Sequence, residues 1–259
     1  MTRLWSEQHQ PASEAELVVT KKKVLEVRDF LTLGANAGRR VLVLRGPAGC
    51  GKAAVLRALC NDLRFEIVEW SVAVRGGAQG EASGVFREPL GDAFLRFLAQ
   101  TDRYRCLPTE VSTSGCAMPR RPRVTLVRDF PFTLVENSGG GRQADAGDFL
   151  QRFQALFHGG ALQRAVFCFN DSREDYFVIS KLLGPVDPAV VLTISFDGVP
   201  RTFAQRALDA AARAEGLDPA AANVAAIAAE CGGDLRHAMN ALQLASGVLR
   251  GAAPKGQAA

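Results

Sequence analysis

Short apolar runs alternate along most of the chain with longer stretches in which apolar residues recur every three or four positions. The short runs predict buried strands, and the longer stretches predict amphipathic helices. The predicted strands cover Val41–Leu44, Phe65–Trp70, Val124–Val127, Ala165–Phe169 and Val190–Ile194. The predicted helices cover Leu17–Leu33, Gly51–Leu63, Pro89–Leu98 and Ala146–Phe157. This alternation favours an α/β fold with a mainly parallel sheet and helices on both faces.

The pattern changes after about Val199 and predicts a small all-helical domain. Asp218 followed by Pro219 is typical of a helix N-cap and first turn. Gly232-Gly233-Asp234 predicts the end of one helix and the cap of the next. The apolar face of that next helix holds residues at helical spacing: Leu235, Met239, Leu242 and Leu249. We therefore expect an α/β domain over residues 1–198, a helical lid over residues 199–250 and a disordered tail over residues 251–259.

Composition and charge limit the compartment and the class of protein. The 259 residues are 47% hydrophobic, which is enough for a core, and the formal net charge of +4 is mild. The 6 cysteines are scattered without a C-x-x-C pair, so we expect reduced thiols and no metal site. No segment has the apolar core of a signal peptide or approaches the roughly 20 apolar residues of a membrane span. We expect a soluble intracellular protein with no membrane partner.

Polar and basic segments predict surface features. Three glycine-rich stretches are typical of surface insertions and cover residues 75–84, 112–123 and 137–147. Two basic runs, Lys21–Lys23 and Arg120–Arg123, stand out. Such runs are usually solvated faces, and the alternative is contact with the phosphates of nucleic acid.

A phosphate-binding loop is the strongest chemical signal. Gly46-Pro47-Ala48-Gly49-Cys50-Gly51-Lys52 matches the pattern G-x-x-x-x-G-K and lies between a predicted strand and a predicted helix. Backbone N–H groups of such a loop surround phosphate, and Lys52 reaches the β- and γ-phosphates. The following residue is normally Ser or Thr, whose hydroxyl binds Mg²⁺, but here it is Ala53. The sequence predicts binding of a nucleoside triphosphate and places efficient hydrolysis in question.

Asp129 is the second candidate residue. It follows the apolar run Val124–Val127, and P-loop ATPases place such a carboxylate beside Mg²⁺. The catalytic base that often follows is missing, because Phe130 and Pro131 come next. Arg128 precedes Asp129, and its cation is expected to compete with the metal for the carboxylate. The alternative is a strand-end Asp that caps a loop.

Two further candidates lie downstream. Asn170-Asp171-Ser172 follows a predicted strand, and Asn170 is expected to face the γ-phosphate; the alternative is a polar turn. Arg236 lies in the first turn of a predicted C-terminal helix. Its guanidinium is expected to contact the nucleotide and to report nucleotide binding through domain closure. The alternative for Arg236 is a solvated surface position.

These elements occur in the order found in AAA+ ATPases, and further segments are similar to one branch of that family. Leu4–Pro11 resembles the W-x-E-K-Y-x-P box of clamp loaders. Additional segments resemble the large subunit of the DNA-damage checkpoint clamp loader, which is replication factor C-like: Glu16–Val24, Glu69-Trp70, Phe97-Leu98, Arg103-Tyr104, Leu126–Pro131 and Gly233–Gln243. The resemblance covers about Leu4 to Ser246.

The resemblance implies an AAA+ P-loop NTPase domain followed by a small all-helical lid. It implies that ATP and Mg²⁺ are the cofactors, with ATP bound by residues 46–53 and Asp129 as metal ligand. It implies that the partners are small replication factor C subunits, a checkpoint sliding clamp and DNA with recessed junctions, in the nucleus. The family's large subunit receives an arginine finger and donates none, and Gly184–Phe196 contains no Arg.

Departures from the family pattern concern hydrolysis and assembly. Ala53 replaces the Mg²⁺-binding hydroxyl, Arg128 replaces an acidic residue, and Gln8 and His9 replace a Lys and a Tyr. Loss of the metal ligand at position 53 and of the base after Asp129 is expected to slow phosphoryl transfer, by analogy with rate losses of about 10²–10³ for a single catalytic donor. The family's helical collar is expected where this sequence stops, so a truncated gene product and a divergent paralogue are both open.

Three functions compete at this point. The first is a clamp-loader subunit that binds ATP and hydrolyses it weakly. The second is a nucleotide-binding scaffold without turnover. The third, a P-loop kinase of a small metabolite, predicts a lid rich in phosphate-binding Arg, whereas the lid offers Arg236 as its candidate.

Overall fold

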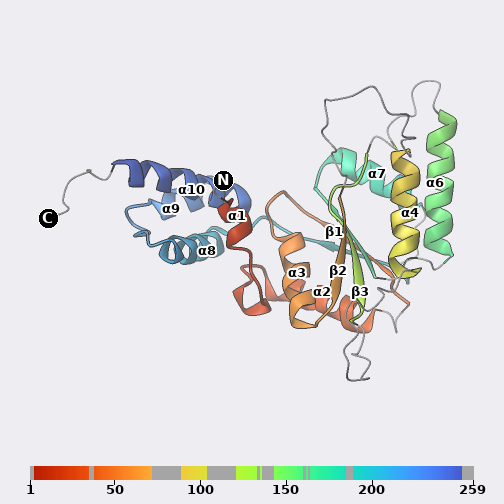
Figure 1. Cartoon of the computed structure of the whole chain (residues 1–259), viewed down its shortest axis with the longest axis horizontal. Helices are drawn as coiled ribbons and strands as arrows, with labels where there is room; N and C mark the ends of the chain where they lie inside the picture. Colours follow the sequence, from red (N-terminus) through yellow and green to blue (C-terminus); the bar gives the residue numbers. More distant parts are fainter. Residues whose placement is uncertain are drawn as a thin grey trace, which may run out of the picture. The chain divides into compact units, whose positions relative to one another are not determined.

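The computed structural model describes residues 3–34, 38–71, 89–103, 121–132, 135, 143–159, 162, 164–184 and 189–252. The described helices are α1 (Trp5–Gln8), η1 (Glu14–Glu16), α2 (Lys21–Leu33), α3 (Lys52–Asp62), α4 (Leu90–Arg103), α6 (Gln143–His158), α7 (Arg173–Leu183), α8 (Arg201–Ala214), α9 (Val224–Glu230) and α10 (Leu235–Ala252). The strands are β1 (Val41–Arg45), β2 (Glu66–Trp70), β3 (Arg123–Val127), β4 (Ala165–Phe169) and β5 (Val191–Ser195). Figure 1 shows these elements along the chain.

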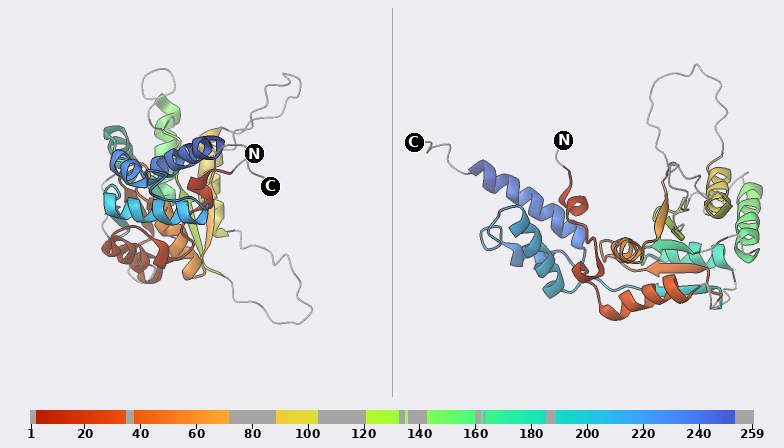
Figure 2. Two further views of the ribbon diagram at one scale, coloured as in Figure 1. Left: turned by 90° about the vertical axis from the view of Figure 1, so that its left-hand side faces the viewer. Right: turned by 60° about the horizontal axis from the view of Figure 1, so that its bottom comes forward.

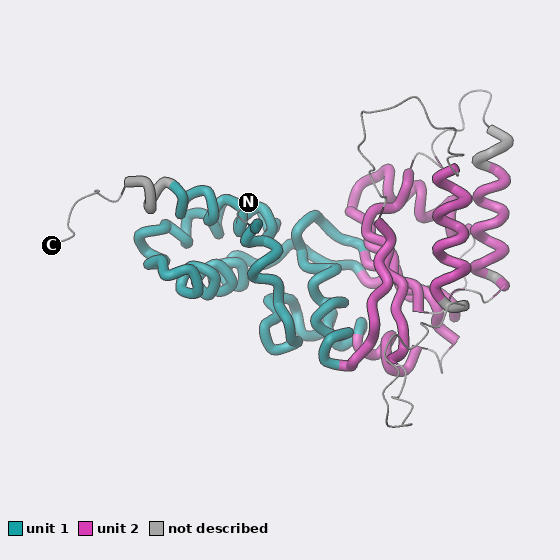
Figure 3. Tube along the Cα trace, in the orientation of Figure 1, with its two compact units in different colours: residues 1–27, 45–62, 195–259 teal, residues 28–44, 63–194 magenta. Residues whose placement is uncertain are grey.

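The chain divides into two compact units that are not contiguous in sequence. Unit 1 contains residues 1–27, 45–62 and 195–259, and unit 2 contains residues 28–44 and 63–194. Figure 3 colours the two units separately. This grouping combines the phosphate-loop helix with the C-terminal helices, so the predicted linear boundary near residue 198 stays a prediction.

Unit 2 is built on a 5-stranded sheet with the order β2-β3-β4-β1-β5. The pairs β2–β3 and β3–β4 are parallel, which confirms the predicted α/β fold with a mainly parallel sheet. The β1 residues Val41–Leu44 are all buried, as expected for a strand covered on both faces. Helices α4 and α6 lie side by side in two orientations of the molecule (Figures 1 and 2).

Aromatic side chains form much of the unit 2 core. Phe94 of α4 packs with Trp70 at a centroid distance of 5.1 Å and with Phe130 at 5.5 Å, both edge-to-face. Phe153 of α6 meets Phe167 of β4 at 6.2 Å. Edge-to-face pairs add to the gain from burial, and they fix α4 and α6 against β2, β3 and β4.

Unit 1 has its own core, in which Trp5 packs among the C-terminal helices. Trp5 is 5% exposed and clusters with apolar residues of α8, α9 and α10. Its backbone N–H donates to Gln243 Oε1 at 3.0 Å, and Gln243 Nε2 donates to the Arg3 carbonyl at 3.1 Å. His9 Nε2 lies 3.0 Å from Glu215 Oε1 near the end of α8. These contacts hold the N-terminal segment against α10 and the end of α8.

Two predicted elements differ from the structure, and one helix was not predicted. The helix predicted from Leu17 begins at Lys21, because residues 17–20 are not helical and a separate 3₁₀ turn, Glu14–Glu16, precedes them. The predicted cap Asp218 starts a turn: its carboxylate accepts from Ala220 N and Ala221 N, but the left-handed Asn223 delays the helix to Val224. Helix α7 follows a segment that the sequence analysis treated only as a polar cluster.

Several predicted surface segments lie partly or wholly outside the described residues. The insertion at residues 75–84 is outside them, and that at residues 112–123 is described only from residue 121. The third insertion overlaps α6, which begins at Gln143, and α10 continues to Ala252, two residues into the predicted tail. Among the helices that the structure describes, none combines the length and hydrophobicity needed to cross a bilayer.

Candidate functional site

The phosphate loop has the predicted setting between a strand and a helix. β1 ends at Arg45 and α3 begins at Lys52, so the loop occupies residues 46–51. Its three glycines have positive φ: 148° at Gly46, 64° at Gly49 and 95° at Gly51. Side chains other than hydrogen disfavour these conformations, so glycine is required by the backbone path of the loop.

Two of these glycines also allow the C-terminal segment of unit 1 to approach the loop closely. A Cβ at Gly46 would lie 2.4 Å from the Phe196 carbonyl oxygen, and a Cβ at Gly49 would lie 1.7 Å from Asp234 Oδ1. Both distances are shorter than any real van der Waals contact. The loop therefore depends on glycine for its contacts with the C-terminal segment as well as for its own conformation.

Backbone donors of the loop are open. In the part of the chain that the structure describes, the N–H groups from Ala48 to Lys52 donate to no acceptor. They precede the first turn of α3, where N–H groups have no partner within the helix and the helix dipole is positive. A run of free donors at a helix start is the arrangement that binds phosphate.

Lys52, the first residue of α3, is 9% exposed. Its Nζ donates to the carbonyl oxygens of Gly46 and Pro47 at 2.7 Å each and lies 3.6 Å from Cys50 Sγ. A buried ammonium needs such partners, because burial without them is costly. The same three donors are suited to phosphate oxygens.

The position after Lys52 offers no metal ligand. Ala53, the second residue of α3, carries only a methyl group. Among the described residues, no group of three or more His, Cys, Asp and Glu side chains is arranged to hold a metal ion. The P-loop fits a nucleotide, whereas its fit to Mg²⁺ is incomplete because the hydroxyl is absent.

The start of α10 contacts the phosphate loop. The Leu235 N–H donates to the Gly49 carbonyl at 3.3 Å, and Asp234 caps α10 by accepting from His237 N at 3.0 Å. Arg236 lies in the first turn, as predicted, and is exposed. The structure thus brings the helix of Arg236 to the loop, while the role of Arg236 toward nucleotide stays a prediction.

The N-terminal segment contacts unit 1 near both ends of α3. Glu14 N donates to Asp62 Oδ2 at 2.8 Å, and Asn61 Nδ2 donates to the Ala12 carbonyl at 2.8 Å, both at the end of α3. Val19 Cγ2 lies 3.1 Å from the position of a Cβ on Gly51. Neither Val19 nor the loop contact of Asp234 was predicted, because neither belongs to a short local motif.

Asp129 and Asn170 belong to unit 2. β3 and β4 pair in parallel, with Val127 opposite Phe167, so the two residues follow the carboxyl ends of neighbouring strands. Both side chains are exposed. The structure confirms their place at the strand ends and brings them together at one edge of the sheet, and their roles stay predictions.

Neighbours of Asp129 and Asn170 have structural roles. Arg128 Nε lies 2.6 Å from Glu69 Oε1 of β2. The Arg128 cation therefore pairs with the carboxylate of Glu69, and this ion pair does not involve Asp129. The Asn170 N–H donates to Asp175 Oδ2 at 2.6 Å, and Ser172 Oγ accepts from Asp175 N at 3.0 Å. The polar cluster therefore caps α7, which supports the structural alternative for Asp171-Ser172 without excluding a role for Asn170.

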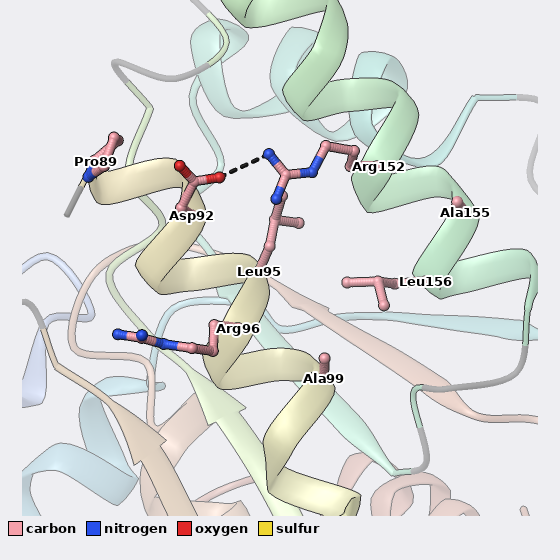
Figure 4. Close-up of a pocket in the computed structure, with 8 residues that line it drawn as sticks. All are labelled: Pro89, Asp92, Leu95, Arg96, Ala99, Arg152, Ala155 and Leu156. Atoms are coloured by element: carbon pink, nitrogen blue, oxygen red, sulfur yellow. Dashed lines mark hydrogen bonds and ion pairs between the residues drawn. The ribbon is translucent and has the colours of Figure 1, made fainter.

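Unit 2 also contains an open groove between α4 and α6. It has a volume of about 790 Å³ and is lined by Pro89, Asp92, Leu95, Arg96, Ala99, Arg152, Ala155 and Leu156. Figure 4 shows Arg152 reaching from α6 to Asp92 of α4, with Nη1–Oδ1 at 2.6 Å. This hydrogen bond raises the pKa of Arg152 above its ordinary value. No predicted site residue lines the groove.

Comparisons with known proteins agree with this geometry. Residues 1–112 match the family model described as Rad17 P-loop domain. The chain is 22% identical to checkpoint protein rad17 of Schizosaccharomyces pombe, over 93% of the chain and 42% of that protein. It is 22% identical to human cell cycle checkpoint protein RAD17, over 93% of the chain and 37% of that protein. The chain is therefore similar to checkpoint clamp-loader proteins of the AAA+ class.

Two further similarities concern a replication factor C subunit and a solved structure. The chain is 26% identical to the replication factor C small subunit of Thermofilum pendens, over 95% of the chain and 64% of that protein. It shares the fold of the RuvB Holliday junction branch migration motor of Thermotoga maritima, with a TM-score of 0.52, 16% identity, and coverage of 93% and 65%. This AAA+ protein spans about two fifths of the length of its curated checkpoint relatives.

Proposed function

We propose that the chain is an ATP-binding subunit of a checkpoint clamp loader, which helps to load a checkpoint sliding clamp onto damaged DNA and hydrolyses ATP weakly. The nucleotide part of this proposal is supported by the run of open N–H donors from Ala48 to Lys52 at the start of α3. Five donors and one buried ammonium suit a polyphosphate.

Nucleotide binding is expected to act through residues of unit 1. Lys52 exchanges the carbonyls of Gly46 and Pro47 for phosphate oxygens, which carry more negative charge and accept stronger hydrogen bonds. Gly49 is hydrogen-bonded to Leu235, so a change in the loop is transmitted to the first turn of α10, where Arg236 lies. ATP then serves mainly as a ligand that selects one lid arrangement.

Hydrolysis is expected to be slow for a chemical reason. Mg²⁺ supplies charge neutralisation of the phosphates when it is bound. Asp129 remains as the proposed ligand, and Ala53 provides none. Asn170 is proposed to polarise the γ-phosphate. Phe130 and Pro131 follow Asp129, where a catalytic base is usual.

The proposed partners are small replication factor C subunits, a checkpoint clamp and DNA with recessed junctions, in the nucleus. The names of the checkpoint and replication factor C relatives support this assignment. The second candidate function is a nucleotide-binding scaffold without turnover, which the methyl group of Ala53 favours.

Affinity purification of the tagged chain from nuclear extract, with and without ATP, tests the assembly. We expect mass spectrometry to find small replication factor C subunits in larger amounts with ATP. A parallel measurement of ATP binding by the purified chain tests the loop separately. Bound ATP without these subunits would reject the clamp-loader assembly and retain the scaffold, whereas absence of ATP binding would reject both readings.

A further inference from the structure

Arginine side chains gather where the strands of unit 2 begin. Arg64 precedes β2, Arg121 and Arg123 lie at the start of β3, Arg164 precedes β4, and Arg39 and Arg40 precede β1. We call these six residues the arginine edge. The order β2-β3-β4-β1 makes their strands consecutive neighbours.

Backbone hydrogen bonds align these strand starts. The Thr125 N–H donates to the Arg164 carbonyl at 3.1 Å, and the Ala165 N–H donates to the Arg40 carbonyl at 2.9 Å. Glu66 of β2 is paired with Arg123 of β3 in the parallel register. The six arginines therefore lie along one edge of the sheet, at the amino ends of the strands, whereas Asp129 and Asn170 follow the carboxyl ends.

Most of the positive charge at this edge is uncompensated. Arg123 Nε lies 2.8 Å from Glu66 Oε2. Within the described residues, the side chains of Arg39, Arg40, Arg64 and Arg121 pair with no carboxylate. Three of them, Arg39, Arg64 and Arg121, are exposed. Like charges on adjacent strands repel one another, so stability of the fold does not account for their accumulation.

Two arginines of the edge are also held in unfavourable conformations. Arg64 has φ 59° and Arg164 has φ 50°, in the left-handed region that non-glycine residues rarely adopt. The Arg164 guanidinium carbon lies 5.6 Å from the ring centroid of Phe65, and its buried Nε has no hydrogen-bond partner among the residues that the structure describes. Conformational strain of this kind is concentrated at functional sites.

The spacing of the edge fits a phosphate backbone. Adjacent strands are about 4.8 Å apart, so four consecutive strands span about 14 Å. One strand of duplex DNA carries about four phosphates over that length. The guanidinium is the side chain that binds phosphate with two parallel hydrogen bonds, and all six residues are Arg.

A peptide or a membrane fits the edge less well. A peptide-binding site needs a shaped apolar groove for side chains, and none of the six arginines lines the groove between α4 and α6. A membrane-binding surface needs apolar side chains that enter the lipid as well as charge. Phosphate contacts need only spaced cations.

We propose that the arginine edge binds the phosphodiester backbone of nucleic acid without sequence preference. The choice of DNA as its natural source rests on the proposed function, but the binding itself does not depend on the phosphate loop. The surface would hold nucleic acid at the sheet edge opposite to the strand ends of Asp129 and Asn170.

The test is fluorescence anisotropy of a labelled 30-base-pair DNA duplex with the full chain, without nucleotide, across a range of salt concentrations. The variant Arg39→Gln/Arg64→Gln/Arg121→Gln removes three exposed charges. If each contacts one phosphate, the slope of log affinity against log salt falls by about 2.7, because each phosphate contact contributes about 0.9. We expect affinity to fall by about 10- to 1,000-fold at low salt.

The matched control is Arg201→Gln/Arg206→Gln/Arg213→Gln, which removes three exposed charges of α8. It has the same net charge as the test variant and is expected to keep the wild-type slope. Equal losses in both triple variants, or an unchanged slope in the test variant, would overturn the proposal. Circular dichroism melting checks that both variants are folded.

Further arms separate the ligand classes and the two proposals. Duplex RNA and single-stranded DNA are expected to bind through the same edge, with the same dependence on the three arginines. Binding of polyglutamate or of phosphatidylserine vesicles at least as tight as that of DNA would overturn the assignment to nucleic acid. Lys52→Ala should bind the duplex like wild type. If that variant loses ATP but keeps DNA, failure of the nucleotide proposal and failure of this one are distinguished.

Discussion

The phosphate loop and the strand ends that carry Asp129 and Asn170 differ in how firmly their functional groups are held. Lys52 is buried, hydrogen-bonded twice and enclosed by three left-handed glycines. Asp129 and Asn170 are exposed side chains at strand ends. The residues suited to phosphate are thus held in place by the fold, whereas the residues predicted to act in hydrolysis are few and weakly constrained.

The largest effect on ATP binding is expected at the phosphate loop. Lys52→Ala removes the buried cation, and hydrogen bonds to charged groups contribute about 1.5–3 kcal/mol each. We expect the Kd for ATP to rise by about 100-fold, which corresponds to about 2.7 kcal/mol. Isothermal titration calorimetry measures it, with Arg57→Ala on the same helix as control. Wild-type affinity in Lys52→Ala would refute the phosphate-loop assignment.

A second change addresses the missing hydroxyl. Ala53→Ser adds the oxygen that binds Mg²⁺ in this family, and we expect ATP hydrolysis to rise by about 10-fold or more if Asp129 acts as the other ligand. Release of inorganic phosphate measures the rate, with Ala54→Ser as the matched control. A rate that does not change would indicate a vestigial site and favour the scaffold without turnover.

A smaller effect, on stability, is expected at the cap of α7, which follows the end of β4. Ser172→Ala removes the oxygen that accepts from Asp175 N at the start of α7. Loss of such a cap costs about 1 kcal/mol of unfolding free energy. Urea denaturation measures it. ATP affinity should stay unchanged; a large loss of ATP binding would show that the polar cluster acts directly on the nucleotide.

The smallest effect is expected for the reactivity of two cysteine thiols, Cys60 in the helix that follows the phosphate loop and Cys168 in strand β4. Burial raises the pKa of Cys60 on α3 from 9.0 to about 12, while Cys168 on β4 is only partly buried. Because the folded pKa lies above the unfolded one, this stabilising contribution is complete below pH 9 and is lost as pH rises toward 12. Alkylation at pH 8 followed by peptide mass spectrometry should modify Cys168 before Cys60. The reverse order would show that the α3 region opens first.

Local patterns predicted the parts of the fold whose causes are local. The strand before Gly46 and the helix after Gly51 have clear periodicity, and both are present in the structure. Asp234 was expected to cap a helix, and its carboxylate does so. In these cases the chemistry and the conformation are determined within a few residues.

Other features depended on information outside a local window. Helix α7 has a cap signal, Ser172 with Asp175 three residues later, which the sequence analysis read only as a turn. The left-handed Asn223 that separates Asp218 from α9 has no clear sequence signal. The contact of Asp234 with Gly49 joins residues far apart in the chain, and no periodicity indicates it.

The bond between Trp5 and Gln243 has a consequence for synthesis of the chain. These residues are separated by 238 positions, so the core of α8, α9 and α10 that buries Trp5 is incomplete until nearly the whole described chain has left the ribosome. At about 5–20 residues per second this delay is on the order of 10–50 s. During that interval an indole that ends in a buried core stays in water, where chaperones bind such side chains. Folding of the unit 1 core is therefore expected to wait until α10 has been synthesised, however early the sheet of unit 2 forms.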